Sequence, residues 1–157
     1  MLDTIFMELD KEIWQIKPFR NVYHRAAVNL IYTGKWIINY HSGIFKKYGL
    51  TLQQYNILRI LNGQYPNAAT VKLIQERMLD KMPDASRIVE NLRKKGLIQR
   101  DLNSGDRRSV DVIITNKGIE LLNTIAEKEN HAMDEFLINL DPEETEQLNY
   151  LLDKIRN

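Results

Sequence analysis

The sequence predicts a mainly α-helical fold of the α+β class, in which helices surround one small antiparallel hairpin. Apolar residues recur at helical spacing through most of the 157-residue chain. Two short strand-like runs, 97–102 and 109–115, flank the turn-forming sequence NSGD at 103–106. No run of 18 apolar residues is present, so we expect no membrane span.

The first 48 residues are predicted to form an N-terminal arm and a long helix. Residues 1–17 carry apolar side chains at helical spacing, and Pro18 punctuates the end of this arm. A second apolar stripe then runs from about Arg20 to Tyr48. At 1.5 Å per residue this helix would be about 40 Å long, more than one small core can cover. We therefore expect part of the stripe to meet a second copy of the chain.

Residues 49–115 are predicted to form three shorter helices followed by the hairpin. Thr51 is the expected N-cap of the first helix, the second runs from Thr70 to Leu79, and the third from Pro83 to Lys95. Helices in this order, followed by a two-stranded wing, are typical of a winged helix-turn-helix. In this motif the second helix of the turn lies in the major groove of DNA.

Residues 116–157 are predicted to add two C-terminal helices. Thr115 is the expected cap of a helix that runs to about Leu140, and Asp141 and Pro142 begin the last helix. Together with residues 1–48, these helices would form a dimerisation frame around the DNA-binding core, within one structural domain. The absence of cysteine fits a reducing compartment, so we expect a cytoplasmic protein.

Charge is distributed unevenly along the chain. The net charge is only +1, but the segment from Lys81 to Arg108 holds eight basic and four acidic residues, a net +4. The remaining 14 basic and 17 acidic residues sum to −3. A basic region on an otherwise mildly acidic protein is the footprint expected for contact with phosphates.

Candidate DNA-contacting residues lie on the third short helix and at the hairpin tip. Arg87, in the first turns of the helix, would reach base edges, where an arginine fork recognises guanine. Arg108 would enter the minor groove, with its guanidinium held by Asp106. The basic run at 93–95 also fits a plain helix C-terminus, where cations are favourable. The predicted DNA-binding residues are Thr70, Lys81, Asp84, Ser86, Arg87, Lys94, Arg107 and Arg108, with Asp106 orienting the wing.

Residues 20–155 resemble the MarR-type winged-helix transcriptional regulators. The resemblance rests on the segments LTLQQYNILRIL, MPDASRIVENLRKKGLIQR and DRRSVDVIITNKG. The last segment follows the family's wing pattern, with Ile114 where the family usually has leucine; the matching residues are Asp106, Arg108, Thr115 and Gly118. The resemblance implies a homodimeric, usually bacterial repressor or activator that binds a pseudo-palindromic operator. In many members a small, often aromatic, effector weakens DNA binding.

Other functions receive less support from the sequence. The aromatic residues Tyr32, Trp36, Tyr40, His41 and Tyr55 are candidates for an effector pocket, although such residues more often form a core or a dimer interface. The three histidines are too dispersed to predict a metal site, and no catalytic motif or cofactor-binding loop is present, so we predict no enzyme. The alternative function is a winged helix that contacts another protein and does not bind DNA.

Overall fold

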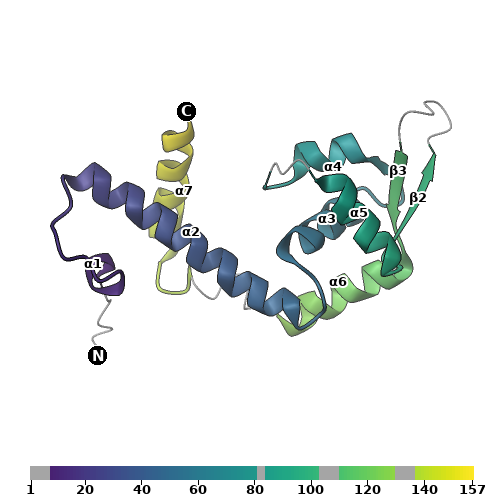
Figure 1. The fold of residues 1–157 in the computed structure, drawn as a ribbon, viewed down its shortest axis with the longest axis horizontal. Coiled ribbons are helices and arrows are strands. Elements are labelled where there is room, and N and C mark those ends of the chain that lie inside the picture. The colour runs from purple at the N-terminus through teal and green to yellow at the C-terminus, as the bar shows by residue number, and fades with distance from the viewer. Residues whose placement is uncertain (1–7, 81–83, 103–109, 130–136) are drawn as a thin grey trace. The chain divides into compact units, whose positions relative to one another are not determined.

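The computed structural model describes residues 8–80, 84–102, 110–129 and 137–157 (Figure 1). Contacts divide the chain into two compact units, Met1–Tyr40 and His41–Asn157, called unit 1 and unit 2 below. The elements, in chain order, are α1 (Leu9–Glu12), α2 (Val22–Lys46), α3 (Leu52–Asn62), β1 (Ala69–Thr70), α4 (Val71–Arg77), α5 (Ala85–Lys94), β2 (Ile98–Leu102), β3 (Val110–Ile114), α6 (Asn116–Lys128) and α7 (Pro142–Arg156).

Local capping signals set the starts of α3, α6 and α7 in unit 2. At α3 the Thr51 hydroxyl accepts from the Gln54 backbone N–H at 3.1 Å, and the Gln54 side chain accepts from the Thr51 N–H at 3.2 Å. Asp141 and Glu144 form the same reciprocal box at α7, with proline at its first position. Each box satisfies two backbone donors that the helix leaves unpaired. The predicted caps at Thr51, Asp141 and Thr115 are therefore confirmed.

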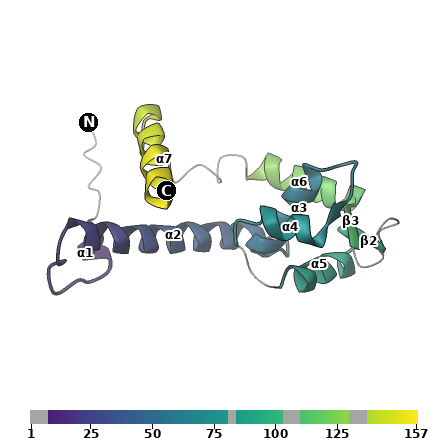
Figure 2. The same ribbon diagram turned by 90° about the horizontal axis from the view of Figure 1, so that it is seen from above.

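The core of unit 2 lies where α3, α4, α5, α6 and the sheet meet. Figure 2 shows α3 with α5 on one side and α6 on the other, and α3 contacts both helices. Burying one large aliphatic side chain contributes about 1.5–3 kcal/mol, so this cluster is the main source of stability of the unit. Its largest fully buried side chains are Phe45, Ile57, Leu58, Leu61, Ile74, Leu92, Ile125, Val89 and Val112.

The sheet has three antiparallel strands in the order β1-β3-β2. The hairpin strands β2 and β3 pair with Arg100 opposite Val112, as the predicted wing requires. On its other side, β3 pairs with β1, where Thr70 lies opposite Asp111. The sequence predicted only the two hairpin strands, because the two residues of β1 are too few to show an alternating pattern.

Two predicted helices differ from the structure in length. Within the described residues the N-terminal arm forms only the four-residue helix α1, and Trp14 follows with a φ of 55°, which is incompatible with a continuing right-handed helix. The prediction that the helix capped by Thr115 reaches Leu140 was wrong. It ends at Lys128, because Glu129 leaves the helical conformation, and residues 137–140 form no α-helix.

Large apolar side chains remain exposed on two helices. The part of α2 in unit 1 exposes Val22, Tyr23, Leu30, Ile31, Trp36 and Ile38. Helix α7 has no buried residue and exposes Tyr150, Leu151 and Ile155. None of the helices in the described part of the chain is both long and apolar enough to cross a membrane.

Candidate DNA-binding interface

Helix α5 has one buried and one exposed face. Ala85, Val89 and Leu92 lie on the buried face and are fully covered by the rest of the unit. Ser86 and Lys94 lie on the other face and are exposed to solvent. The spacing of three or four residues between buried positions is that of an amphipathic helix, so the core fixes which α5 side chains point outward.

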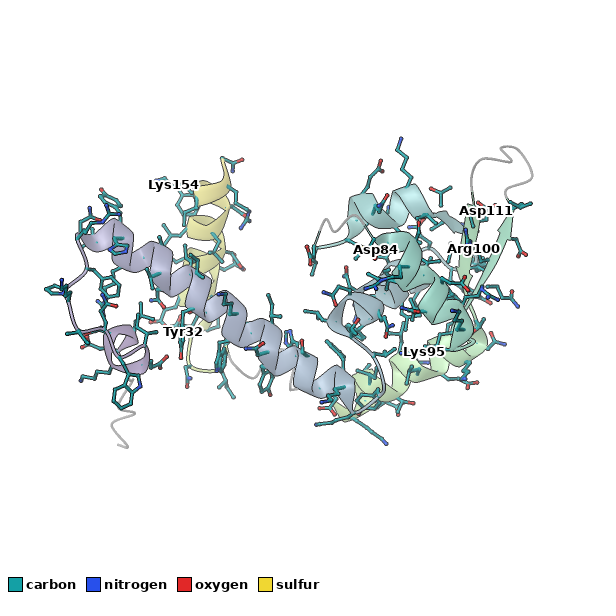
Figure 3. The ribbon with its side chains drawn as sticks, viewed as in Figure 1. Tyr32, Asp84, Lys95, Arg100, Asp111 and Lys154 are labelled. Atoms are coloured by element: carbon teal, nitrogen blue, oxygen red, sulfur yellow. The ribbon has the colours of Figure 1, made fainter. Side chains whose placement is uncertain are left out.

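The first turn of α5 presents Arg87 to solvent. Asp84 occupies the N-cap position, but its side chain makes no capping hydrogen bond. Instead, Asp84 Oδ2 lies 2.8 Å from Arg87 Nε, and the Arg87 side chain remains 78% exposed. Figure 3 shows Asp84 and Lys95 at opposite ends of α5, with Arg100 and Asp111 on the neighbouring strands. An exposed guanidinium at this end of α5 can contact a ligand outside the unit.

Glu90, in the middle of α5, binds arginines from two elements. Its carboxylate accepts from Arg93 Nε at 2.9 Å and from Arg93 Nη2 at 2.7 Å, which is a bidentate pair on the same helix. Arg100 Nη1, on β2, lies 3.7 Å from Glu90 Oε2. The hydrogen bond from Arg93 holds the pKa of Glu90 below its usual range, and the same bond raises the pKa of Arg93.

The C-terminal end of α5 is tied to the start of α3 through Lys95. Its ammonium donates to the Gly49 carbonyl and, at 2.9 Å, to Gln54 Oε1. Gln54 is only 6% exposed, and its amide oxygen also belongs to the α3 capping box. Lys95 therefore serves to position α5, whereas the adjacent Lys94 makes no such bond with any described residue.

The threonine and glycine of the wing pattern have structural roles. The Thr115 hydroxyl accepts from the Gly118 N–H at 3.2 Å, which caps α6. A Cβ on Gly118 would lie 2.4 Å from the Leu97 carbonyl oxygen and 2.7 Å from Ile114 Cγ1. No side chain fits there, so glycine allows α6 to begin directly against the hairpin strands.

The predicted DNA-binding residues fall into three groups. Ser86, Arg87 and Lys94 lie together on the exposed side of α5, with Asp84 at its start. Thr70 is half-buried, pairs within the sheet and caps α4 by accepting from the Leu73 N–H at 3.1 Å. The others lie outside the described residues: Lys81, Asp106, Arg107 and Arg108.

The sequence placed Glu90 on the outward face of this helix and counted Lys95 and Arg100 in the basic region, but it assigned none of the three a role at the site. The spacing of three residues from Glu90 to Arg93 was a usable signal for the first, because such residues are neighbours on a helix. The pairing of Glu90 with Arg100 depends on how β2 packs beside α5, and sequence periodicity does not give that position.

The five aromatic candidates for an effector pocket lie in different environments. Tyr32 and Trp36 line a groove of about 690 Å³ in unit 1, together with residues of α1 and α2. Partial burial and a hydrogen bond with Glu12 raise the pKa of Tyr32. The Tyr40 ring stacks on Trp36 at 6.0 Å between centroids.

In unit 2, two of these aromatics pack on Phe45 instead. Tyr55 stacks on the Phe45 ring at 4.0 Å and is only 8% exposed, and the His41 ring lies 6.1 Å from Phe45. Tyr55 therefore belongs to the core of unit 2. Within the described ranges, no group of three or more potential ligand side chains is arranged to hold a metal ion.

The buried and exposed faces of α5, its tie to α3 and the adjacent hairpin define a winged helix-turn-helix protein. Comparison with known proteins agrees with this class. The family model described as MarR family matches residues 48–109. The HTH-type transcriptional regulator MgrA of Staphylococcus aureus is 28% identical over 138 residues, which cover 86% of this chain and 90% of MgrA.

Solved structures show the same fold. A MarR transcription factor from Planctomyces limnophilus superposes with a TM-score of 0.68 at 28% identity, covering 87% of this chain and 98% of the other. A mutant of MarR from Escherichia coli complexed with operator DNA gives a TM-score of 0.73 at 19% identity, covering 95% and 99%. Residues 48–109 thus match the MarR family, and the fold of the chain is that of MarR winged-helix structures.

Proposed function

We propose that this regulator binds specific sequences in duplex DNA by inserting α5 into the major groove. The observation that carries the proposal is the division of α5 into a fully buried face and a face that presents Ser86, Arg87 and Lys94 to solvent. A likeness of fold to a MarR protein complexed with operator DNA supports the same use of the helix. The rigid core behind α5 holds these side chains in a fixed register, as base reading requires.

Within this proposal the basic residues have different tasks. Arg87 reads a guanine edge through its fork, and Ser86 contacts bases or sugar beside it. Lys94 contacts phosphate, which positions the protein without reading sequence. Arg107 binds phosphate and Arg108 enters the minor groove, oriented by Asp106. Lys81 and Asp84 are further candidate DNA contacts.

The regulator acts as a homodimer on a pseudo-palindromic operator. The exposed apolar side chains of α2 and α7 support this proposal, because monomeric proteins rarely leave so many large apolar groups in water. A two-fold dimer places two α5 helices on two half-sites of a palindrome. A small aromatic effector that enters the groove beside Tyr32 and Trp36 would change the spacing of the two α5 helices and so weaken DNA binding. This regulation of transcription takes place in the cytoplasm.

Selection of bound fragments from a pool of random duplex DNA tests the proposal. We expect enrichment of a two-fold symmetric sequence and binding that falls steeply with salt, with a slope of about 0.9 per phosphate neutralised. Enrichment of an asymmetric sequence would argue against the homodimer. If no fragment is enriched and binding at low salt is absent, the winged helix serves protein contact instead.

A further inference from the structure

We propose that Glu90 acts as an internal counterion that competes with DNA phosphates for Arg93 and Arg100. The carboxylate thereby limits the affinity of the α5 surface for any polyanion. This inference rests on the proposed DNA-binding function, because it assigns Glu90 a role that weakens DNA binding. No DNA-contacting role was predicted for Glu90 from the sequence.

The geometry of Glu90 is that of a phosphate substitute. Its two oxygens occupy the Nε and Nη2 donors of Arg93 at 2.9 and 2.7 Å, in the fork arrangement that arginine also uses to bind phosphate. The Glu90 carboxylate also lies 3.7 Å from Arg100 Nη1 on β2. One carboxylate on the recognition helix therefore engages guanidinium groups from the helix and from the wing.

Most basic side chains of this surface already form an ion pair or hydrogen bond within the protein. Asp84 pairs with Arg87, Glu90 with Arg93 and Arg100, and Lys95 is bound to Gly49 and Gln54. Lys94 forms no ion pair or hydrogen bond with any described residue. Residues 84–102 carry five basic and three acidic groups, a net +2, with the basic set Arg87, Arg93, Lys94, Lys95 and Arg100 and the acidic set Asp84, Glu90 and Asp101.

The ion pairs at Glu90 are weak enough to exchange. The Arg93 side chain is 49% exposed and that of Glu90 is 31% exposed, so water and salt screen their attraction. A DNA phosphate must nevertheless displace Glu90 before it gains the full interaction with either arginine. Arg93 and Arg100 therefore contribute less to phosphate binding than their charge predicts, and removing the competing carboxylate increases their contribution.

A matched pair of variants tests this competition. Glu90→Gln and Asp101→Asn each remove one negative charge, but Asp101 makes no ion pair with any described residue. We measure binding of each variant to a random-sequence duplex across a salt series. Glu90→Gln should bind about three- to tenfold more tightly at low salt and steepen the slope by about one to two, at roughly 0.9 per added phosphate. Asp101→Asn should tighten binding less and leave the slope unchanged.

The double variant Glu90→Gln/Arg93→Ala identifies the groups involved. If Glu90→Gln frees Arg93 to bind phosphate, adding Arg93→Ala should remove at least half of the increase in the salt slope that Glu90→Gln produces. Circular dichroism melting checks that all variants remain folded. Equal effects of Glu90→Gln and Asp101→Asn, or weaker binding by Glu90→Gln, would overturn the proposal.

Elution from immobilised heparin separates this inference from the proposed function. Heparin is a polyanion that requires no base recognition, so Glu90→Gln should elute at higher salt than Asp101→Asn even if the protein reads no operator. A wild-type protein that binds no duplex DNA would contradict the proposed function. Identical elution of the two variants would contradict the role of Glu90.

Discussion

Isoleucine side chains are buried in the core of unit 2 but exposed on one face of α2. Ile57 on α3 is 0% exposed, whereas Ile31 on α2 is 61% exposed. The helices and sheet of unit 2 cover their own apolar side chains, whereas unit 1 leaves Ile31 and several other apolar side chains of α2 exposed. The surface that we propose reads DNA is thus built on a self-sufficient core, whereas the proposed dimerisation surface needs a second copy.

Replacing each of these two isoleucines by alanine is the strongest test of this difference. Ile57→Ala should lower the free energy of unfolding by about 2–5 kcal/mol, because it removes buried apolar contacts and leaves a cavity. Ile31→Ala should cost much less, and only to the extent that it weakens a dimer. Urea unfolding at several protein concentrations measures both effects. Equal losses at every concentration would mean that Ile31 is already buried by its own chain.

A charge on the exposed face of α2 should disrupt self-association. Ile31→Asp would place a carboxylate in the proposed interface, and we expect the dimer dissociation constant to rise at least tenfold, about 1.4 kcal/mol. Sedimentation equilibrium measures this constant. Asn39→Asp adds the same charge at an exposed polar position of α2 and serves as the control. If both variants remain as dimeric as the wild type, the dimer forms through another surface.

The two adjacent lysines at the end of α5 should respond differently to the same substitution. Lys95→Met removes the hydrogen bonds to Gly49 and Gln54, so it should destabilise the protein by about 1–2 kcal/mol. Lys94→Met should leave the stability unchanged and lower the salt slope of DNA binding by about 0.9. Thermal melts and a salt series on both variants test this prediction. The reverse pattern would mean that Lys95 is the phosphate contact and Lys94 the structural group.

The smallest expected effect is the pH dependence of the Glu90 ion pairs. Because the folded-state pKa of Glu90 is lowered, its contribution is fully present above the pKa of the unfolded chain. This contribution is lost as the pH falls through the folded-state value. Wild type should therefore be only slightly more stable than Glu90→Gln near neutral pH, since solvent screens the pair.

Urea unfolding of both proteins at a series of pH values measures this difference. The stability difference between wild type and Glu90→Gln should disappear as the solution becomes acidic. A difference that grows toward low pH would contradict the assigned direction.

Local signals made much of the fold predictable from the sequence. Thr51, Thr115 and Asp141 set helix starts through hydrogen bonds to residues three positions away. The end of α6 was not predictable in this way. Just after it, Glu129 accepts a hydrogen bond from the Tyr48 hydroxyl, and the packing of segments far apart in the sequence brings these two residues together. The two-residue strand β1 likewise depends on pairing with β3.

The candidate site shows the same division between local and distant information. Helical periodicity sufficed to place Arg87 and Lys94 on the exposed side of α5. The bond from Lys95 to Gln54 joins residues 41 positions apart, so only the folded structure reveals it. Thr70, which the sequence predicted to contact DNA, caps α4, a role that accounts for its hydroxyl without DNA.

The variant Arg87→Ala shows whether the exposed side of α5 reads bases. Binding of the variant and the wild type is measured on the selected operator and on a panel of its single-base variants, with Arg108→Ala beside them. Arg87→Ala should cost about 1–3 kcal/mol on the operator and relax the preference at one or two positions. Arg108→Ala should weaken binding across the panel. Uniform losses for both variants would contradict the claim and make Arg87 a phosphate contact.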